Sequence, residues 1–249
     1  MTLESELKKI KMEETILLVN ARKKKPSFID EKLEEYIPED LESTLKSVFE
    51  LAFRKIFSDG TKIIAATFDK DKPEEAEDMI KKSRIAGMVD TGITFVEGTG
   101  LGILGVGVPD IPVFAAMVLR NVYQIAATYG FSYDDKTEQI YILKLIKGAL
   151  AKGKDAEALS DQVDEYANKI DVLGYRHNLW IDQEMEDAAN ALADSMLYMK
   201  FIQTIPVVGA VGGLSNASVI RKISKYADVK YHKRMILRKM AMEDTTDEE

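Results

Sequence analysis

The stretch that decides the fold of this 249-residue chain is 92–130, GITFVEGTGLGILGVGVPDIPVFAAMVLRNVYQIAATYG. Its first sixteen residues contain six glycines, and the prolines Pro109 and Pro112 follow them. The remainder is apolar at helical spacing and carries one charged side chain, Arg120. Apolar residues that recur with the helical period predict a helix that buries this face. We therefore expect this stretch to lie at the centre of a helical core.

The rest of the chain also has helical periodicity, and no segment shows convincing strand alternation. Helices are predicted at 3–25, from Pro38 to a stop at Asp59-Gly60, and at 140–150, 155–172, 176–200 and 221–240. Of these, 140–150 is apolar on most faces. Asp135 and Glu138 precede this buried helix at the spacing of a capping box. The sequence therefore predicts an all-α fold, a helical bundle in which two Gly/Pro-containing apolar helical segments pack together as the core.

The predicted domain organisation has three parts. N-terminal helices occupy 1–72, the main helical domain occupies 73–242, and 243–249 forms an acidic disordered tail. The tail is predicted because five of these last seven residues are acidic, which leaves little apolar surface to bury.

The two apolar segments are 98–119 and 201–220, and each contains proline and a pair of glycines four residues apart. Such pairs let helix backbones approach closely. Three interpretations remain open: the core of a soluble domain, a re-entrant or interfacial hairpin in one leaflet, or a complete membrane span. Polar side chains within both segments argue against the complete span. The glycines and prolines concerned are Gly98, Gly102, Pro109, Pro112, Pro206, Gly209 and Gly213.

Composition narrows the class of protein. Apolar residues make up 46% of the chain and charged residues 31%, which is typical of a folded protein. The chain has no cysteine, which excludes disulfides, thiolate metal ligands and cysteine nucleophiles. The N-terminal residues lack the pattern of a secretory signal, so we expect a cytoplasmic protein.

The net charge of −8 hides a strong segregation of charge. The segment 221–239 carries eight Lys or Arg residues against the single acid Asp228, and a basic block occupies 22–25. Lysine and arginine clusters are attracted to anionic lipid, so Lys230, Lys233 and Arg234 are candidate binding residues for the inner face of the cell membrane. A solvated helix face is the alternative. Nucleic acid is a weaker candidate because no nucleic-acid motif is present.

Two motifs in the right order resemble the EcsC family. The first is the glycine-rich lead into Val108–Pro112 with the following helix, which contains Leu119 and Arg120 and ends at Ala127–Phe131. The second is Ile205–Gly213, followed by Asn216 and Arg221. The resemblance implies a bacterial, helical protein that is cytoplasmic or membrane-associated, and some members are encoded beside an ABC transporter. It implies no catalytic residue; the motif positions expected to matter are Asp110, Pro112, Arg120, Tyr129 and Gly130.

No constellation of catalytic residues is evident in the sequence. Residues 100–105 match GxGxxG, but Pro109 and Pro112 interrupt the helix that a dinucleotide site requires. His177 and His232 lack the spacing of metal ligands, so we expect neither a cofactor nor a metal. Asp110 is predicted to cap the next helix, or to pair with Arg120, which in turn could bind an anionic ligand.

These observations favour a non-enzymatic, membrane-associated cytoplasmic protein that binds an anionic lipid surface or a membrane-protein partner. A soluble helical bundle that holds an apolar or acyl ligand is the first alternative. An enzyme with a site near Asp110, Arg120 and Tyr129 is the second.

Overall fold

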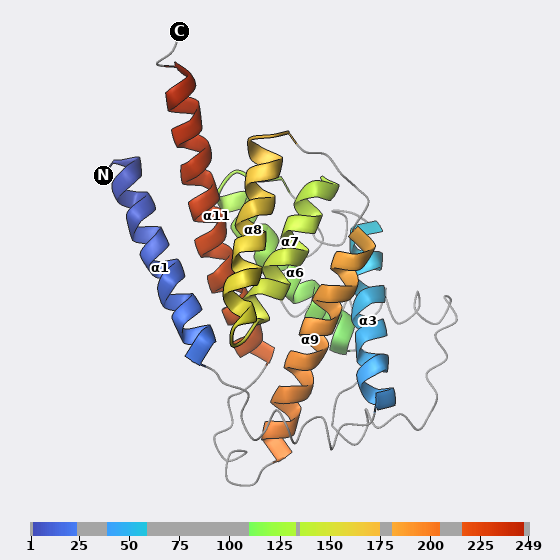
Figure 1. Cartoon of the computed structure of the whole chain (residues 1–249). Helices are drawn as coiled ribbons and strands as arrows, with labels where there is room; N and C mark the ends of the chain where they lie inside the picture. Colours follow the sequence, from blue (N-terminus) through green and yellow to red (C-terminus); the bar gives the residue numbers. More distant parts are fainter. Residues whose placement is uncertain are drawn as a thin grey trace, which may run out of the picture.

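The computed structural model describes residues 2–23, 39–58, 110–132, 135–174, 181–204 and 216–246. These residues form a bundle of helices and contain no strand, which confirms the all-α prediction (Figure 1). The helices are α1 (Leu3–Lys23), α3 (Glu39–Ser58), α6 (Asp110–Thr128), α7 (Lys136–Leu150), α8 (Asp155–Asp171), α9 (Ile181–Thr204) and α11 (Asn216–Thr246).

Helix α7 lies at the centre of the bundle and packs against α8, α9 and α11. Its residues 140–143 are all buried, as expected for a segment that is apolar on most faces. The prediction of a buried helix at 140–150 is therefore confirmed. Helices α3 and α6 complete the main core together with α9 and α11.

Helix α1 lies at the edge of the bundle along α11 (Figure 1). A small separate cluster joins these two helices, in which Ile10 packs with Val229 and Ile236 of α11. Only one side of α1 is covered in this way, because its contacts with the bundle are made to α11 and α8. The opposite side of the helix faces outward.

The end of α6 shows why the motif glycine at 130 is required. Gly130 has a φ of 79°, a left-handed conformation that glycine adopts without the steric cost of a side chain. Its N–H donates to the carbonyl of Ala127 at 3.1 Å, and that of Phe131 donates to Ala126 at 2.9 Å. This pair of hydrogen bonds is the Schellman motif, which satisfies carbonyls at the end of the helix.

A second glycine permits a close contact between helices. A Cβ atom at Gly148 of α7 would lie 2.9 Å from the hydroxyl oxygen of Tyr226 of α11. The tyrosine ring therefore fits against α7 only because residue 148 has no side chain.

The second apolar segment, 201–220, is divided between two helices at its described ends. Residues 201–204 complete α9, whereas 216–220 begin α11. The predicted glycine pairs at Gly98, Gly102, Gly209 and Gly213, and the prolines Pro109 and Pro206, lie outside the described residues, as does the predicted boundary at 72/73. Helix α11 continues to Thr246, into the range that we predicted to be a disordered tail.

Candidate functional site

One face of α11 carries the three cations that the sequence suggested as lipid-binding residues. Lys233 and Arg234 follow Lys230 by three and four positions, so all three lie on this side of the helix. The structure directs them inward, toward α1, α7 and α8, and Lys230 and Arg234 are buried. Their partners are carboxylates of those helices.

Lys230 and Lys233 share two carboxylates. The amino group of Lys230 donates to Glu14 of α1, to the carbonyl of Ser160 at 3.1 Å and to Asp164 of α8 at 2.8 Å. Lys233 donates to the second oxygen of Glu14 and to the second oxygen of Asp164, both at 2.6 Å. Each lysine therefore bridges α1 and α8.

The neighbouring lysines lower the pKa of Glu14. Burial alone would raise the pKa of its carboxyl, but attraction to Lys230 and the hydrogen bonds from both lysines outweigh that effect. The pKa of Glu14 consequently lies below its ordinary value. The carboxylate is ionised at neutral pH and completes the network.

Arg234 joins α11 to α8 and α7. Its Nε donates to Asp171 at 2.6 Å, and Nη2 donates to the other oxygen of Asp171 at 2.9 Å. Its Nη1 donates to both oxygens of Glu138, at 2.8 and 2.9 Å, and the hydroxyl of Tyr231 donates to the same carboxyl. Burial raises the pKa of Glu138 against the opposing effect of Arg234. The guanidinium also lies over the ring of Tyr141, at 4.5 Å.

A pocket of about 290 Å³ opens beside this network, between α8 and α11. Tyr141 and the charged network form its inner wall, and apolar side chains near the end of α8 and the last turns of α11 form its outer part. The full lining comprises Tyr141, Asp164, Ala167, Asn168, Asp171, Val172, Lys230, Lys233, Arg234, Leu237, Arg238, Ala241 and Met242.

Tyr129, another predicted site residue, lies in a different contact. Its hydroxyl donates to Asp228 of α11 at 2.8 Å, and its ring stacks on His232 with the ring centres 5.2 Å apart. His232 in turn contacts Glu6 of α1 at 2.8 Å. Burial, followed by the effect of Asp228, raises the pKa of Tyr129. This arrangement fixes the end of α6 to α11 and places α1 beside it.

The structure does not bring Asp110, Arg120 and Tyr129 together. Helix α6 begins at Asp110, and the backbone of Arg120 lies about 15 Å further along the helix axis. The side chain of Asp110, and with it the predicted cap or ion pair, lies outside the described residues. Arg120 is half-buried and forms no ion pair with the described residues. Pro112 is buried in the first turn, where a helix tolerates proline. Asp110 and Tyr129 therefore lie at opposite ends of α6, with Arg120 between them.

The carboxylate partners were missed at the level of sequence. Glu14 interrupts the apolar face of 3–25, between Ile10 and Leu17, and a charge on that face is a signal of a buried ion pair. Glu138 was interpreted as half of a capping box. In the structure Asp135 is the N-cap, but it accepts from the N–H of Thr137 at 3.0 Å, and the carboxyl of Glu138 binds Arg234 instead.

Comparison with known proteins extends the resemblance to nearly the whole chain. The sequence model of the EcsC protein family matches residues 3–236, from the first turn of α1 to just beyond Arg234 of α11. The chain belongs to the EcsC family. The family match therefore includes α1 and its buried residue Glu14, which lie outside both sequence motifs.

Two relatives come from Bacillus subtilis (strain 168). Protein EcsC is 23% identical over 213 residues, which cover 84% of this chain and 84% of the relative. The uncharacterized protein YdbA is 25% identical over 194 residues, which cover 72% of this chain and 70% of that protein. No solved structure matches this EcsC-family chain.

Two further observations concern metals and membranes. Within the described ranges, no group of three or more His, Asp or Glu side chains is arranged to hold a metal ion. None of the helices described for this EcsC-family protein combines the length and apolar character needed to cross a bilayer.

Proposed function

We propose that this protein is a non-enzymatic, peripheral membrane protein of the cytoplasm that binds anionic lipid through the outer face of α1. The observation that carries the proposal is an exposed apolar stripe on α1 with lysines beside it. Met12, Ile16 and Val19 are 68%, 50% and 42% exposed, and their spacing places them on one side of α1. Isolated apolar residues are common on surfaces, but three aligned on one helix face favour an interaction site.

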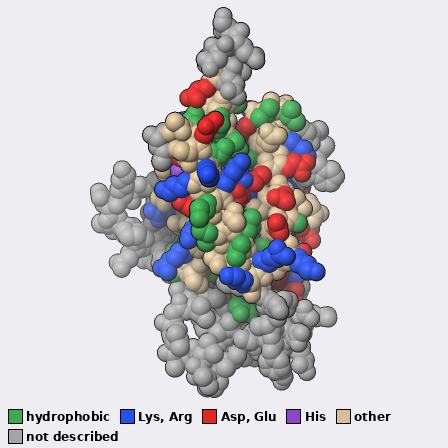
Figure 2. All heavy atoms as spheres, turned by 60° about the vertical axis from the view of Figure 1, so that its left-hand side comes forward, with side chains coloured by type: hydrophobic (Ala, Val, Ile, Leu, Met, Phe, Trp, Pro, Cys, Tyr) green, Lys and Arg blue, Asp and Glu red, His purple; other side chains and the backbone are tan. Residues whose placement is uncertain are grey.

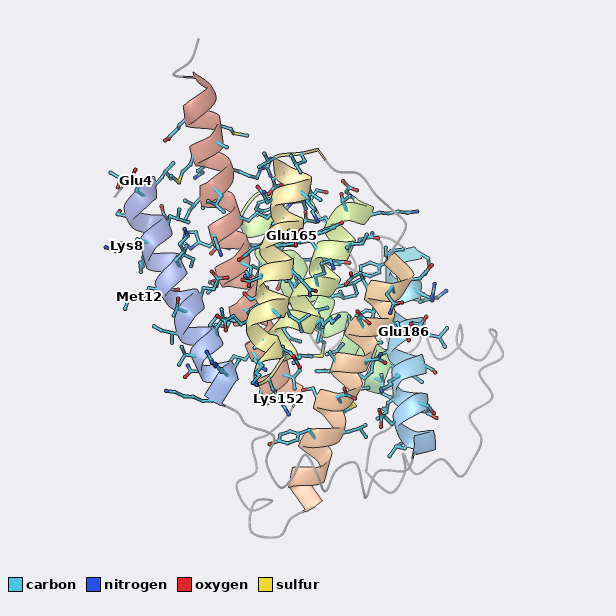
Figure 3. All side chains as sticks on the ribbon, in the orientation of Figure 1. Glu4, Lys8, Met12, Lys152, Glu165 and Glu186 are labelled. Atoms are coloured by element: carbon cyan, nitrogen blue, oxygen red, sulfur yellow. The ribbon has the colours of Figure 1, made fainter. Side chains whose placement is uncertain are left out.

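Cations accompany the stripe. Lys8, Lys9 and Lys23 are exposed, and the helical period places them on the same outward side as Met12. Figure 3 shows Lys8 and Met12 both pointing away from α11. In Figure 2, the side of the molecule that comes forward has apolar side chains between Lys and Arg side chains. A helix with apolar and lysine side chains on its outer surface is typical of proteins that lie in the membrane interface.

Two of the four acids of α1 support the same orientation, whereas Glu4 and Glu13 are exposed. Glu14 is buried against Lys230, and Glu6 contacts His232, so two carboxylates that would repel anionic lipid face the bundle. The ion pairs also fix the rotation of α1 about its axis. The apolar stripe is thereby held outward.

The basic surface continues past the end of α1. The N–H of Gly153 donates to the carbonyl of Ala21 at 3.2 Å, which places the loop between α7 and α8 beside the last turn of α1. Lys152 and Lys154 of this loop are exposed, as is Arg22, which lies 3.9 Å from Glu157. Each such cation near an anionic surface contributes about 1 kcal/mol to binding.

The proposed binding surface on α1 differs from the residues of α11 that the sequence suggests. The amino and guanidinium groups of Lys230, Lys233 and Arg234 already bind carboxylates of the chain, so they are not available to lipid phosphates. The exposed cations of α1 supply the electrostatic attraction in their place.

Co-sedimentation with vesicles tests the proposal. The purified protein is mixed with neutral vesicles, or with vesicles that contain phosphatidylglycerol, at low and high salt. We expect binding to the anionic vesicles that weakens with salt, because the attraction to lipid phosphates is screened. The variant Lys8→Glu/Lys9→Glu should lose most of this binding.

A charge-matched control separates α1 from α11. Arg221→Glu/Lys225→Glu changes two exposed cations of α11 by the same total charge and should retain most of the binding. Loss of binding in this control alone would assign the lipid contact to α11. No binding of the unaltered protein to either vesicle would contradict the proposal and favour a membrane-protein partner.

A further inference from the structure

The pocket between α8 and α11 exists because ion pairs, rather than apolar side chains, join these helices along much of their contact. Asp164 meets Lys230 and Lys233, and Asp171 meets Arg234. These long side chains bridge the helices, and a hollow of about 290 Å³ remains beside them. This volume lies near the lower end of the range for pockets that bind small molecules.

A residue of the inner wall, Tyr141, carries a buried polar atom without a described partner. The side chain of Tyr141 is fully buried and lines the pocket, and its hydroxyl has no hydrogen-bond partner among the described residues. A buried tyrosine hydroxyl normally has a partner. A polar atom of a ligand in the pocket would supply it.

The charge of the lining favours an anion. Asp164 and Asp171 are both neutralised by cations of α11, as described above. Arg238 also lines the pocket, and it forms no ion pair within the described part of the chain. Its guanidinium lies 5.1 Å from the ring centre of Phe131, beside that of Arg234. An uncompensated guanidinium is a donor suited to a carboxylate.

The outer part of the pocket is apolar. Val172 follows α8, and Leu237, Ala241 and Met242 line the last turns of α11. Val172, Leu237 and Met242 are exposed to solvent in the chain alone. An acyl chain laid over these side chains would remove apolar surface from water on both partners.

We infer that this pocket binds an acyl chain that ends in a carboxylate, with the carboxylate held by the Tyr141 hydroxyl and the Arg238 guanidinium. The methylene groups lie along Val172, Leu237 and Met242. This site is distinct from the outer face of α1, and the inference does not depend on the proposed lipid-surface function.

Calorimetric titration of the full chain in vesicle-free buffer tests the inference. The probes are decanoate, decanol and decylamine, which share a chain length and differ in the charge of the head group, each below its micellar concentration. We expect decanoate to bind most tightly and decylamine least tightly, because Arg238 attracts the first and repels the second. Acetate, which has the same head group without the chain, should bind far more weakly.

Two substitutions locate the head group. Tyr141→Phe should weaken decanoate binding about fivefold, because one hydrogen bond is lost. Arg238→Gln should weaken it about tenfold or more, because the lost hydrogen bond carries a full charge. The matched controls Tyr226→Phe and Lys239→Gln alter residues that do not line the pocket and should leave the Kd unchanged.

Three results would overturn the inference. One is the absence of binding by all the amphiphiles, and another is binding of decylamine as tight as that of decanoate. The third is a decanoate Kd that neither Tyr141→Phe nor Arg238→Gln changes relative to its control. Arg238 is exposed, so Arg238→Gln keeps the test decisive even if Tyr141→Phe disturbs the core.

Discussion

The amino group of Lys230 lies against the carboxylate of Glu14, which is 216 residues earlier in the chain, and both side chains are buried. Asp164 shares the same amino group, so the contact joins α1, α8 and α11. A buried ion pair contributes little over an apolar pair of the same shape, but removing one partner is costly. The value of this network is therefore geometric, because it fixes which side of α1 faces outward.

Glu14→Gln should destabilise the protein by about 3 kcal/mol, because Lys230 and Lys233 lose the charge they share. Chemical denaturation followed by circular dichroism measures the change. Glu13→Gln is the matched control, since it alters the exposed neighbouring residue and should change the stability by about 0.5 kcal/mol or less. Equal effects of the two substitutions would contradict the role given to Glu14.

The stability should also depend on pH through Glu14. Its folded-state pKa lies below the ordinary value of 4.5, so its contribution is present above about pH 4.5 and is lost as the pH falls through the folded-state pKa. The difference in unfolding free energy between the unaltered protein and Glu14→Gln should be constant from about pH 7 to pH 5 and shrink below about pH 4.5. A difference that grows on acidification would have the wrong sign.

Gly148→Ala should destabilise the bundle by about 1–3 kcal/mol, because the new methyl group would lie 2.9 Å from the Tyr226 hydroxyl oxygen. Tyr226→Phe removes that oxygen and should recover part of the loss in the double variant. The unfolding free energies of the two single variants and the double variant form a cycle. Additive effects in this cycle would show that the two side chains do not meet.

Gly130→Ala should destabilise α6 by about 1–2 kcal/mol, because φ at this position is 79°. Gly130→Asn should cost less, since asparagine adopts the left-handed conformation more readily than alanine. Thermal or chemical denaturation of the two variants provides the comparison. An alanine variant as stable as the unaltered protein would contradict the hydrogen-bonded end described for α6.

The helices were predictable because their apolar periodicity is local. The predicted range 155–172 corresponds to α8 at 155–171, and 3–25 corresponds to α1 at 3–23. The buried character of α7 was also visible in its composition. Local periodicity did not, however, show that 201–204 complete α9 and 216–220 begin α11.

The candidate site was only partly predictable. Lys230, Lys233 and Arg234 were identified as a basic cluster, but charge patterning within one segment cannot show partners that are distant in sequence. Their carboxylates come from α1, α7 and α8, and only folding brings them together. An inward-facing cation and an exposed one look the same in sequence until the packing of the helix is known.

The most direct test of the lipid-binding account is the environment of Met12 on the vesicle surface. The chain has no cysteine, so Met12→Cys and Glu186→Cys each give a single site for an environment-sensitive fluorophore. Figure 3 shows these residues on opposite sides of the bundle. On addition of phosphatidylglycerol vesicles, the account predicts a blue shift for the label at position 12 and none for that at 186. A shift at 186 alone, or no shift at position 12 while the protein sediments with the vesicles, would contradict it.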